Sequence, residues 1–486
     1  DASPIYTWGT DTSKNDTGLS ANTKYTYTIA ARDNTGETRG AWHNATAAVG
    51  TTSKYTLQNP ATAPTFGTIT ANSIALVTTG PVNLAADNSG VIFKRNGTTD
   101  LAKAQALTTT DGGLAANTQY SYTARGVNGD NVATAESASA SAWTLSVAPA
   151  AGTVTAAAVT YGDEVSWTAV NGFGAGKVQY YRYAFDQNAT KTSWTDTEPQ
   201  WSSGVLKVRP TAAGTWYLHI KGYNGANVGN GYYDYAVTVN KKALTVTGLT
   251  AQNKVYDATT VASLSGTAAL LAAEDPGTGS TSDGKPYTGD DVSVGGTAAG
   301  TFSNKDVGTG KAVTVTGCTL SGAQAGNYTA TQPAGLTADI TPKALTVTGL
   351  TAQNKVYDAT TAASLSGAAA LLAAEDPGTG STSDGKPYTG DAVSAGGTAA
   401  GTFSNKDVGT GKVVTVTGCT LSGAQAGNYT ATQPTGLTAD ITPKALTITG
   451  LSAVNKFYDG TTAVTLNGAA SLLAAEGPGT GTTSDG

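Results

Sequence analysis

The chain has 486 residues, which is too many for a single hydrophobic core and predicts a series of separate domains. Only 13% of the residues are charged, the formal net charge is −6, and 61 glycines are present, a composition that favours β-strands joined by turns. It argues against a nucleic-acid-binding protein, which needs clustered Lys and Arg, and no apolar run reaches the roughly 20 residues that span a bilayer.

A tyrosine motif occurs twice near the start of the chain. Residues 19–31 read LSANTKYTYTIAA and residues 114–126 read LAANTQYSYTARG. The pattern L-x-x-x-T-x-Y-x-Y resembles the fibronectin type III module, in which a leucine leads into a tyrosine whose hydroxyl bonds back to the chain. Ala21 and Ala116 stand where that family usually has proline. We expect one such module, cut at its start, over residues 1–58 and a complete one over residues 59–145.

Residues 146–241 have a different character, since they hold four of the seven tryptophans. The run GTWYLHIKGYNGAN (residues 214–227) alternates and predicts a strand with Trp216 facing inward and His219 outward. It resembles Ig-like modules of bacterial surface proteins. The aromatic residues Trp194, Trp201 and Tyr181 could form a platform that binds surface glycans, or they could be core; the usual burial of aromatic rings favours core.

The rest of the chain is built from repeats. The text KALTVTGLTAQNKVYDATT begins at Lys242 and again at Lys343, and a variant of it begins at Lys444, so the period is 101 residues. This predicts domains over residues 242–342 and 343–443 and a shorter third copy over 444–486. A period of this length is the size of an independent domain. An enzyme rarely needs the same site twice in a row, so near-identical copies favour a mechanical role over a catalytic one.

Within each repeat, two-residue alternation predicts strands, with one exception. The run from Thr267 to Pro276 has compact Ala and Leu, a Thr start and a terminal Pro, and it predicts a short helix with Glu274 at an exposed end. Cys318 and Cys419 occupy matching strand positions and are interpreted as small buried hydrophobes, with an interchain disulfide as the alternative. No Cys/His cluster or calcium-loop spacing is present, so we expect no metal and no cofactor.

The segment NKVYDATT, which contains Lys254, Tyr256 and Asp257, allows two interpretations. A lysine beside a carboxylate could form an intramolecular isopeptide bond, but that reaction also needs a nearby buried acid. The second interpretation is a strand-to-turn signature, in which the Tyr256 ring packs, its hydroxyl meets the backbone and Asp257 caps the turn. We favour the signature. Its matching residues are Lys355, Tyr357, Asp358, Tyr458 and Asp459.

No catalytic triad is expected in the repeats, because residues 242–486 contain no histidine. His43 and His219, the two histidines of the chain, are each isolated in the sequence. A lone histidine on a strand is more often structural than a base or a metal ligand. We therefore expect no enzyme activity from this chain.

Six ordered motifs link the repeats to a known family. They are KALTVTG, KVYDATT, GDDV, FSNKDVGTGK, LSGAQAGNYT and ITPK, and together they resemble the YDG-type repeat of large secreted adhesins of the filamentous-haemagglutinin kind. In the first two copies Ala258 and Ala359 replace the glycine of that name, which returns as Gly460. The resemblance implies an all-β, Ig-like or β-grasp-like unit in a surface-exposed array, without enzymatic activity.

The expected fold is therefore an all-β, elongated tandem array of Ig-like and fibronectin type III-like β-sandwich domains, with a short helix inserted in each repeat. The expected function is a non-catalytic stalk or filament-forming adhesin segment of an extracellular or cell-surface protein. Two alternatives remain: an accessory region of an extracellular polysaccharide-active enzyme, and a self-assembling fibre or surface-layer subunit. The expected partners are other copies of the chain, neighbouring domains and surface or host ligands. The sequence does not identify a ligand.

Overall fold

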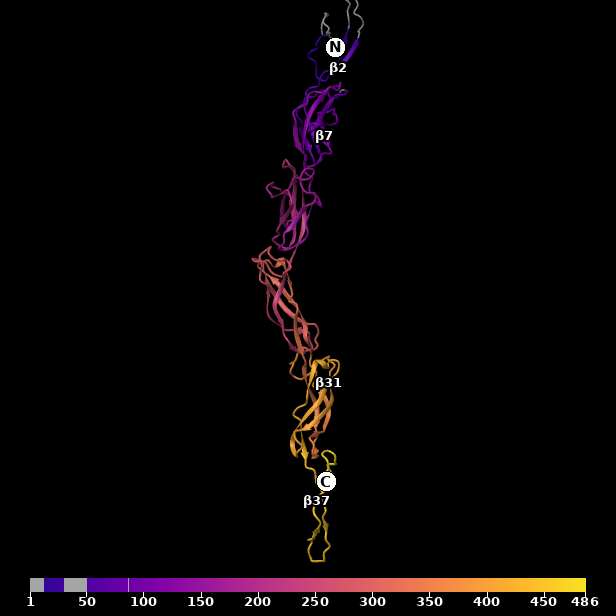
Figure 1. The fold of residues 1–486 in the computed structure, drawn as a ribbon, viewed down its shortest axis with the longest axis vertical. Coiled ribbons are helices and arrows are strands. Elements are labelled where there is room, and N and C mark those ends of the chain that lie inside the picture. Colours follow the sequence, from indigo (N-terminus) through magenta and orange to yellow (C-terminus); the bar gives the residue numbers. More distant parts are fainter. Residues whose placement is uncertain (1–12, 30–49, 86) are drawn as a thin grey trace, which may run out of the picture. The chain divides into compact units, whose positions relative to one another are not determined.

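The described residues of the chain form β-strands joined by turns and loops. The computed structural model describes residues 13–29, 50–85 and 87–486, and the chain divides into two compact units, residues 1–242 and 243–486. In these residues the helices are two three-residue 3₁₀ turns, η1 (Ala325–Asn327) and η2 (Ala426–Asn428). Neither is long enough to cross a membrane, and the same holds for every helix in the described ranges. Strands and the segments that connect them dominate the ribbon (Figure 1). The all-β tandem array is confirmed.

The first unit contains three sets of sheets. The first set is an antiparallel pair, β1 (Lys24–Ile29) with β2 (Gly50–Tyr55). The second is a sandwich of the order β3 (Thr65–Ile69), β4 (Ser73–Val77), β7 (Thr108–Gly112) facing β6 (Thr99–Asp100), β5 (Gly90–Arg95), β8 (Gln119–Val127), β9 (Ala140–Trp143). The third set consists of two sheets. One has the order β10 (Val154–Thr155), β12 (Val165–Ala169), β15 (Val205–Val208). The other has the order β11 (Val159–Thr160), β17 (Gly229–Asn240), β16 (Gly214–Tyr223), β13 (Tyr180–Asp186), β14 (Gln200–Trp201).

The tyrosine motif closes the fibronectin-like modules as the sequence predicts. The backbone N–H of Ala115 donates to the Tyr120 hydroxyl at 3.0 Å, and the N–H of Ser20 donates to the Tyr25 hydroxyl at the same distance. In the second module, Ile74 and Tyr122 are fully buried in one cluster between the two sheets. The leucine-to-tyrosine spacing therefore fixes a corner of the sandwich, although alanine replaces the usual proline.

The second unit contains the repeats, and the first two copies have the same topology. In the first copy, one sheet has the order β21 (Leu264–Leu270), β18 (Lys242–Ala251), β24 (Tyr328–Thr331). The other sheet has the order β19 (Lys254–Val255), β25 (Leu336–Thr341), β23 (Gly308–Ser321), β22 (Ser293–Phe302), β20 (Val261–Ala262). In the second copy, one sheet has the order β29 (Leu365–Leu371), β26 (Lys343–Ala352), β32 (Tyr429–Thr432). The other sheet has the order β27 (Lys355–Val356), β33 (Thr438–Thr442), β31 (Gly409–Ser422), β30 (Ser394–Phe403), β28 (Ala362–Ala363).

The third copy has two short strand pairs in the described sequence. They are β34 (Ile448–Thr449) with β37 (Ser471–Leu472) and β35 (Ser452–Ala453) with β36 (Leu466–Asn467). Phe457 and Tyr458 are almost fully exposed, whereas the corresponding Tyr256 is buried. The strands that cover this tyrosine in the complete repeats correspond to positions beyond residue 486.

The predicted helix from Thr267 to Pro276 is wrong. Its first half belongs to β21, where Leu270 pairs with Val246 of β18, and Glu274 forms an isolated bridge with Tyr287. The Ala and Leu content favours a helix locally, but pairing with a neighbouring strand and burial of one face outweigh a preference of less than about 1 kcal/mol per residue. The second repeat repeats this arrangement in β29.

Candidate functional site

The lysine and aspartate of the NKVYDATT segment hold one turn together. Lys254 Nζ lies 2.7 Å from Asp257 Oδ1, and it also donates to the carbonyl oxygens of Thr259 and Val261 at 2.8 and 2.9 Å. Asp257 Oδ1 accepts the backbone N–H of Thr259 at 2.9 Å, so the aspartate caps the turn. Lys355 with Asp358 and Lys456 with Asp459 do the same in the other copies, at 2.7 and 2.8 Å.

The residue after the motif aspartate has a positive φ in all three copies. Ala258 and Ala359 have φ of +60° and +63°, in the left-handed region that disfavours side chains, and Gly460 has φ of +74° at the matching position. The first two copies therefore carry backbone strain that the third avoids. The lysine and aspartate contacts keep the strained turn in place.

Replacing Ala359 with glycine should stabilise the second repeat by about 0.5–1 kcal/mol, because the relief of left-handed strain exceeds the added entropy of the unfolded chain. Calorimetric unfolding of the full chain measures the change. Ala362→Gly, at an exposed strand position without positive φ, is the matched control and should be neutral or destabilising. Equal effects of the two substitutions would contradict the strain argument.

Tyr256 reaches from the first repeat into the second. Its side chain is fully buried, and its hydroxyl donates to Asp391 Oδ2 at 2.8 Å. Its ring meets Tyr429 and Tyr388 edge-on, with centroids 5.3 and 6.0 Å away. The expected backbone partner of this hydroxyl is therefore wrong: the partner is a carboxylate 135 residues further along the chain.

Asp391 is the centre of this junction. Its side chain is 1% exposed, Tyr429 donates a second hydroxyl to it at 2.7 Å, and Lys305 Nζ lies 2.6 Å away. Burial alone would raise the pKa of Asp391, but the bonds from Lys305, Tyr429 and Tyr256 hold that pKa below its usual value. Burial and the same carboxylate raise the pKa of Tyr256. The site is an ionised carboxylate held by three donors.

Further contacts join the same two repeats. Asn428 Oδ1 accepts the backbone N–H of Val307 at 2.9 Å, and its Nδ2 donates to Asp306 Oδ1 at 3.1 Å. The N–H of Gly378 donates to the carbonyl oxygen of Asp257 at 3.0 Å. One buried apolar cluster includes Tyr256 from the first repeat and Leu345 from the second. The two repeats thus share part of one core.

The motifs that mark each repeat divide between the two sides of this junction. KVYDATT and FSNKDV of the first repeat supply Tyr256, Lys305 and Asp306, whereas GDAV and GNYT of the second supply Asp391 and Asn428. We call the first set the plug and the second set the socket. In the second repeat, the plug residue Tyr357 accepts a hydrogen bond from Lys406 Nζ at 3.2 Å, and the position matching Asp391 would lie beyond residue 486.

The aromatic residues considered as a glycan platform lie mostly inside their module. Tyr181 and Trp201 are each 4% exposed, and both pack edge-on or tilted against Phe173 and each other. Trp194 is half-buried beneath Lys191, whose Nζ is 5.2 Å from the ring centroid. Tyr181 and Trp201 are therefore core residues that offer no exposed ring face to a sugar, and a platform of these three residues is not formed.

His219 is not the outward-facing, isolated residue that alternation predicts. Its side chain is fully buried, with Nδ1 2.6 Å from Asp234 Oδ1 and Nε2 3.4 Å from Asp186 Oδ1. Both carboxylates sit on neighbouring strands, β17 and β13, and strand pairing brings them to the imidazole. A one-dimensional pattern does not reveal partners on other strands. His43 lies outside the described residues.

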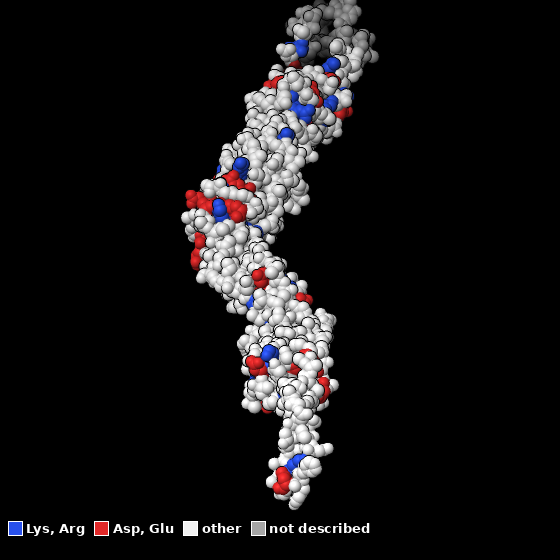
Figure 2. All heavy atoms as spheres, turned by 60° about the horizontal axis from the view of Figure 1, so that its bottom comes forward, with Lys and Arg blue, Asp and Glu red and all other residues white. Residues whose placement is uncertain are grey.

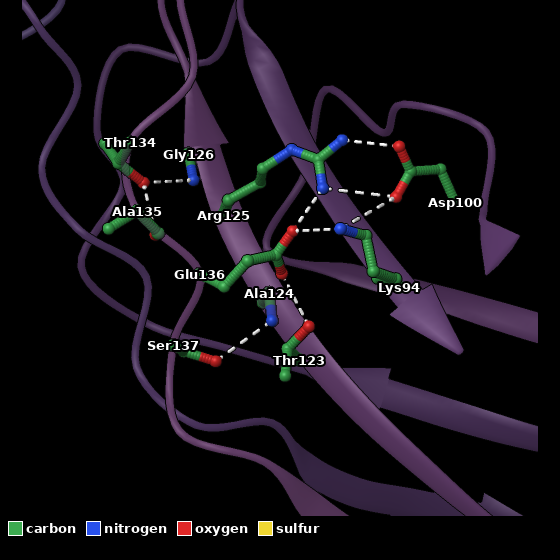
Figure 3. Close-up of polar contacts among 10 residues, drawn as sticks. All are labelled: Lys94, Asp100, Thr123, Ala124, Arg125, Gly126, Thr134, Ala135, Glu136 and Ser137. Carbon is green, nitrogen blue, oxygen red and sulfur yellow. Dashed lines mark hydrogen bonds and ion pairs between the residues drawn. The ribbon is translucent and has the colours of Figure 1, made fainter. Parts of the chain in front are cut away.

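Charged side chains gather into clusters of mixed sign. On the second fibronectin-like module, Lys94 and Arg125 bridge Glu136 and Asp100; Lys94 Nζ lies 2.7 Å from Glu136 Oε1, and Arg125 contacts both acids (Figure 3). Despite partial burial, bonds from Lys94, Thr123 and Arg125 hold the pKa of Glu136 at about 2. Figure 2 shows red and blue side by side amid broad uncharged areas, so this face carries no extended basic patch.

The two cysteines are buried free thiols. Cys318 and Cys419 are each 5% exposed and pack with Val315 and Val416 respectively. Each backbone is tied to a neighbouring glutamine, such as Gln332, through paired hydrogen bonds at 3.0 and 2.8 Å. These positions make them core residues of their repeats.

Comparison with known proteins identifies a family model that matches the repeats. The family model described as the YDG domain matches residues 240–335, 341–436 and 442–483. Exoglucanase B of Cellulomonas fimi is 35% identical over 213 residues, which cover 39% of this chain and 18% of that protein. This chain therefore spans less than a fifth of that relative.

Two solved structures align with parts of this chain at low TM-scores. A two-domain fibronectin type III segment of chicken tenascin has 13% identity and a TM-score of 0.27, covering 37% of this chain and 99% of the other. The FN1–FN3 domains of chicken CNTN1 have 11% identity and a TM-score of 0.21, covering 55% and 88%.

Proposed function

The second half of this chain, residues 240–483, belongs to the YDG domain family, and on this premise we propose that the protein is a non-catalytic stalk segment of a secreted or cell-surface adhesin. Each repeat adds length, and a junction between two repeats restricts the orientation of one relative to the other. The neighbouring domains of the same chain are then its main partners. The ligand would be held by another part of the protein.

The observation that supports this proposal is the buried contact between Tyr256 and Asp391. A flexible linker would leave successive repeats independent, whereas here a tyrosine of one repeat completes the core of the next. Pro342 lies between β25 and β26, and its fixed φ restricts the backbone at the connection between the two repeats. A stalk needs this kind of coupling, because a loosely tethered array does not hold a binding tip away from a surface.

Distance measurements across the junction test the coupling. Spin labels at the exposed positions Thr301 and Thr402 of the full chain should give one narrow distance distribution. Tyr256→Phe removes a hydroxyl bonded to a buried carboxylate and should broaden that distribution. Tyr357→Phe removes the same group from a tyrosine that bonds Lys406 instead, and should leave the distribution unchanged. A broad distribution in the unsubstituted chain would refute a coupled stalk.

A second candidate function is an accessory region of an extracellular polysaccharide-active enzyme. The match to Exoglucanase B favours it, since a part of that enzyme 213 residues long is similar to this chain. Sedimentation of the full chain with insoluble glucan separates the candidates. Retention by glucan supports the accessory region and counts against the stalk, whereas no retention leaves the stalk as the better account.

A further inference from the structure

A buried lysine in the second repeat is surrounded by two carboxyl groups. Lys343, the first residue of β26, has no exposed side-chain surface. Its Nζ lies 2.5 Å from Glu375 Oε1 and 3.0 Å from Asp384 Oδ1. The ring centroid of Tyr388 is 4.1 Å from the same nitrogen. The exposed fractions of Glu375 and Asp384 are 12% and 22%, so a fully buried amine meets two carboxylates that are only partly exposed to solvent.

The backbone fixes both carboxyl groups in place. Asp384 Oδ1 accepts the N–H of Lys386 at 3.0 Å, and the N–H of Thr346 in β26 donates to the carbonyl oxygen of Gly385 at 3.0 Å. A Cβ at Gly380 would stand 1.9 Å from Glu375 Oε2, so bare backbone covers this acid. The loop that carries Asp384 is thus pressed onto the strand that carries Lys343.

The protonation states of Lys343 and Asp384 determine which proton has to move before the two side chains can react. Burial alone would lower the pKa of Lys343, but bonds to Glu375 and Asp384 raise it, while bonds from Lys386 and Lys343 hold the pKa of Asp384 at about 2 against its burial. The ion pair is therefore the starting state. Glu375 is within hydrogen-bonding reach of both partners, so it can accept a proton from the amine and pass it to Asp384.

We propose that Lys343 and Asp384 form an intramolecular isopeptide bond with Glu375 as the proton carrier. The amine, freed of one proton, attacks Cγ of protonated Asp384. A C–N bond forms, Glu375 takes a second proton from the attacking nitrogen and delivers it to the hydroxyl of Asp384, and the C–O bond breaks as that hydroxyl leaves as water. No oxidant or other reactant is needed. The product is a neutral amide, so the reaction removes two charges from a site where their desolvation is costly.

The same set of residues recurs with the repeat. Lys444 lies 3.0 Å from Asp485 and contacts Glu476 in the third copy, and the sequence keeps Lys242, Glu274 and Asp283 at the matching positions of the first. By contrast, Lys254 and Lys355 of the NKVYDATT segment pair with one aspartate and with backbone carbonyls. A lysine with a single acid has no separate proton carrier, so the bond is assigned to Lys343 and not to Lys355.

The mass of the denatured full chain tests the proposal. Each isopeptide bond lowers the mass by one water relative to the sum of the residues. After tryptic digestion, Lys343 should remain joined to the peptide that ends at Lys386, which Ala362 and Ala368 distinguish from its counterpart in the first repeat. A chain with the full summed mass would show that these residues form an ion pair only and would overturn the proposal.

Three variants assign the roles. Lys343→Arg should recover the mass of one water, and Glu375→Gln should leave Lys343 and Asp384 unlinked. Lys355→Arg, in the same repeat, should keep the linked peptide. Persistence of the link in Glu375→Gln would overturn the role of Glu375. Because the unsubstituted chain alone decides whether the bond exists, a variant that fails to fold does not obscure the result.

Discussion

Replacing Asp391 with alanine should weaken the junction between the first two repeats by about 3 kcal/mol, because three donors lose one buried acceptor. The hydroxyls of Tyr256 and Tyr429 would then be left without their carboxylate, at a cost of roughly 1–3 kcal/mol for a buried unsatisfied group. Lys305 is 37% exposed and can turn to water, so it adds little. Tyr256 should separate from the socket while each repeat stays folded.

Hydrogen exchange of the full chain measures this effect locally. Peptides around Tyr256 and Tyr388 should exchange faster in Asp391→Ala, whereas the strands around Val416 should not change. The difference from the unsubstituted chain should also depend on pH. The folded pKa of Asp391 is depressed, so its stabilisation is present above the unfolded value of about 3.9 and is lost as pH falls through the folded value. Unaltered exchange near Tyr256 at neutral pH would contradict the assigned role.

The sequence predicts the strands and the repeat, but it does not predict the junction. Two-residue alternation and the 101-residue period are local and self-similar signals, and they identify the sandwiches and the turn capped by Asp257 correctly. Asp391 is 135 residues from Tyr256 and belongs to another copy of the repeat. A pattern inside one copy cannot show that one of its motifs contacts another motif in the next copy.

The remaining errors concern residues whose local sequence pattern suggests one placement and whose partners on other strands give them a different one. The Ala-rich run after Thr267 favours a helix until β18 offers it a pairing partner. His219 follows an outward-facing pattern, but two aspartates on adjacent strands cover it. The residues of the Lys343 site were each visible in the sequence, and the wrong helix placed the repeat's glutamate at an exposed end. In the structure Glu375 lies beyond the end of β29, forms an isolated bridge with Tyr388 and contacts the buried Lys343.

Replacing Gly349 with alanine should destabilise the second repeat by about 3 kcal/mol. The added Cβ would clash with a neighbouring carbonyl oxygen, and the positive φ of this residue disfavours any side chain. Gly349 has φ of +85°, and a Cβ there would stand 2.3 Å from the carbonyl oxygen of Ala368. On the partner strand, a Cβ at Gly367 would stand 2.2 Å from the carbonyl oxygen of Gly349. The irregularity between β26 and β29 therefore depends on two facing glycines.

Calorimetric unfolding of the full chain should show a lower transition for Gly349→Ala than for the unsubstituted protein. Gly427→Ala is the matched control, since no atom lies within 4 Å of a Cβ at Gly427 and its φ is not positive; we expect a change within about 0.5 kcal/mol. Similar tolerance of both substitutions would mean that β26 and β29 can separate at the bulge. Because β26 also begins with Lys343, such freedom would weaken the placement of the lysine beside its two acids.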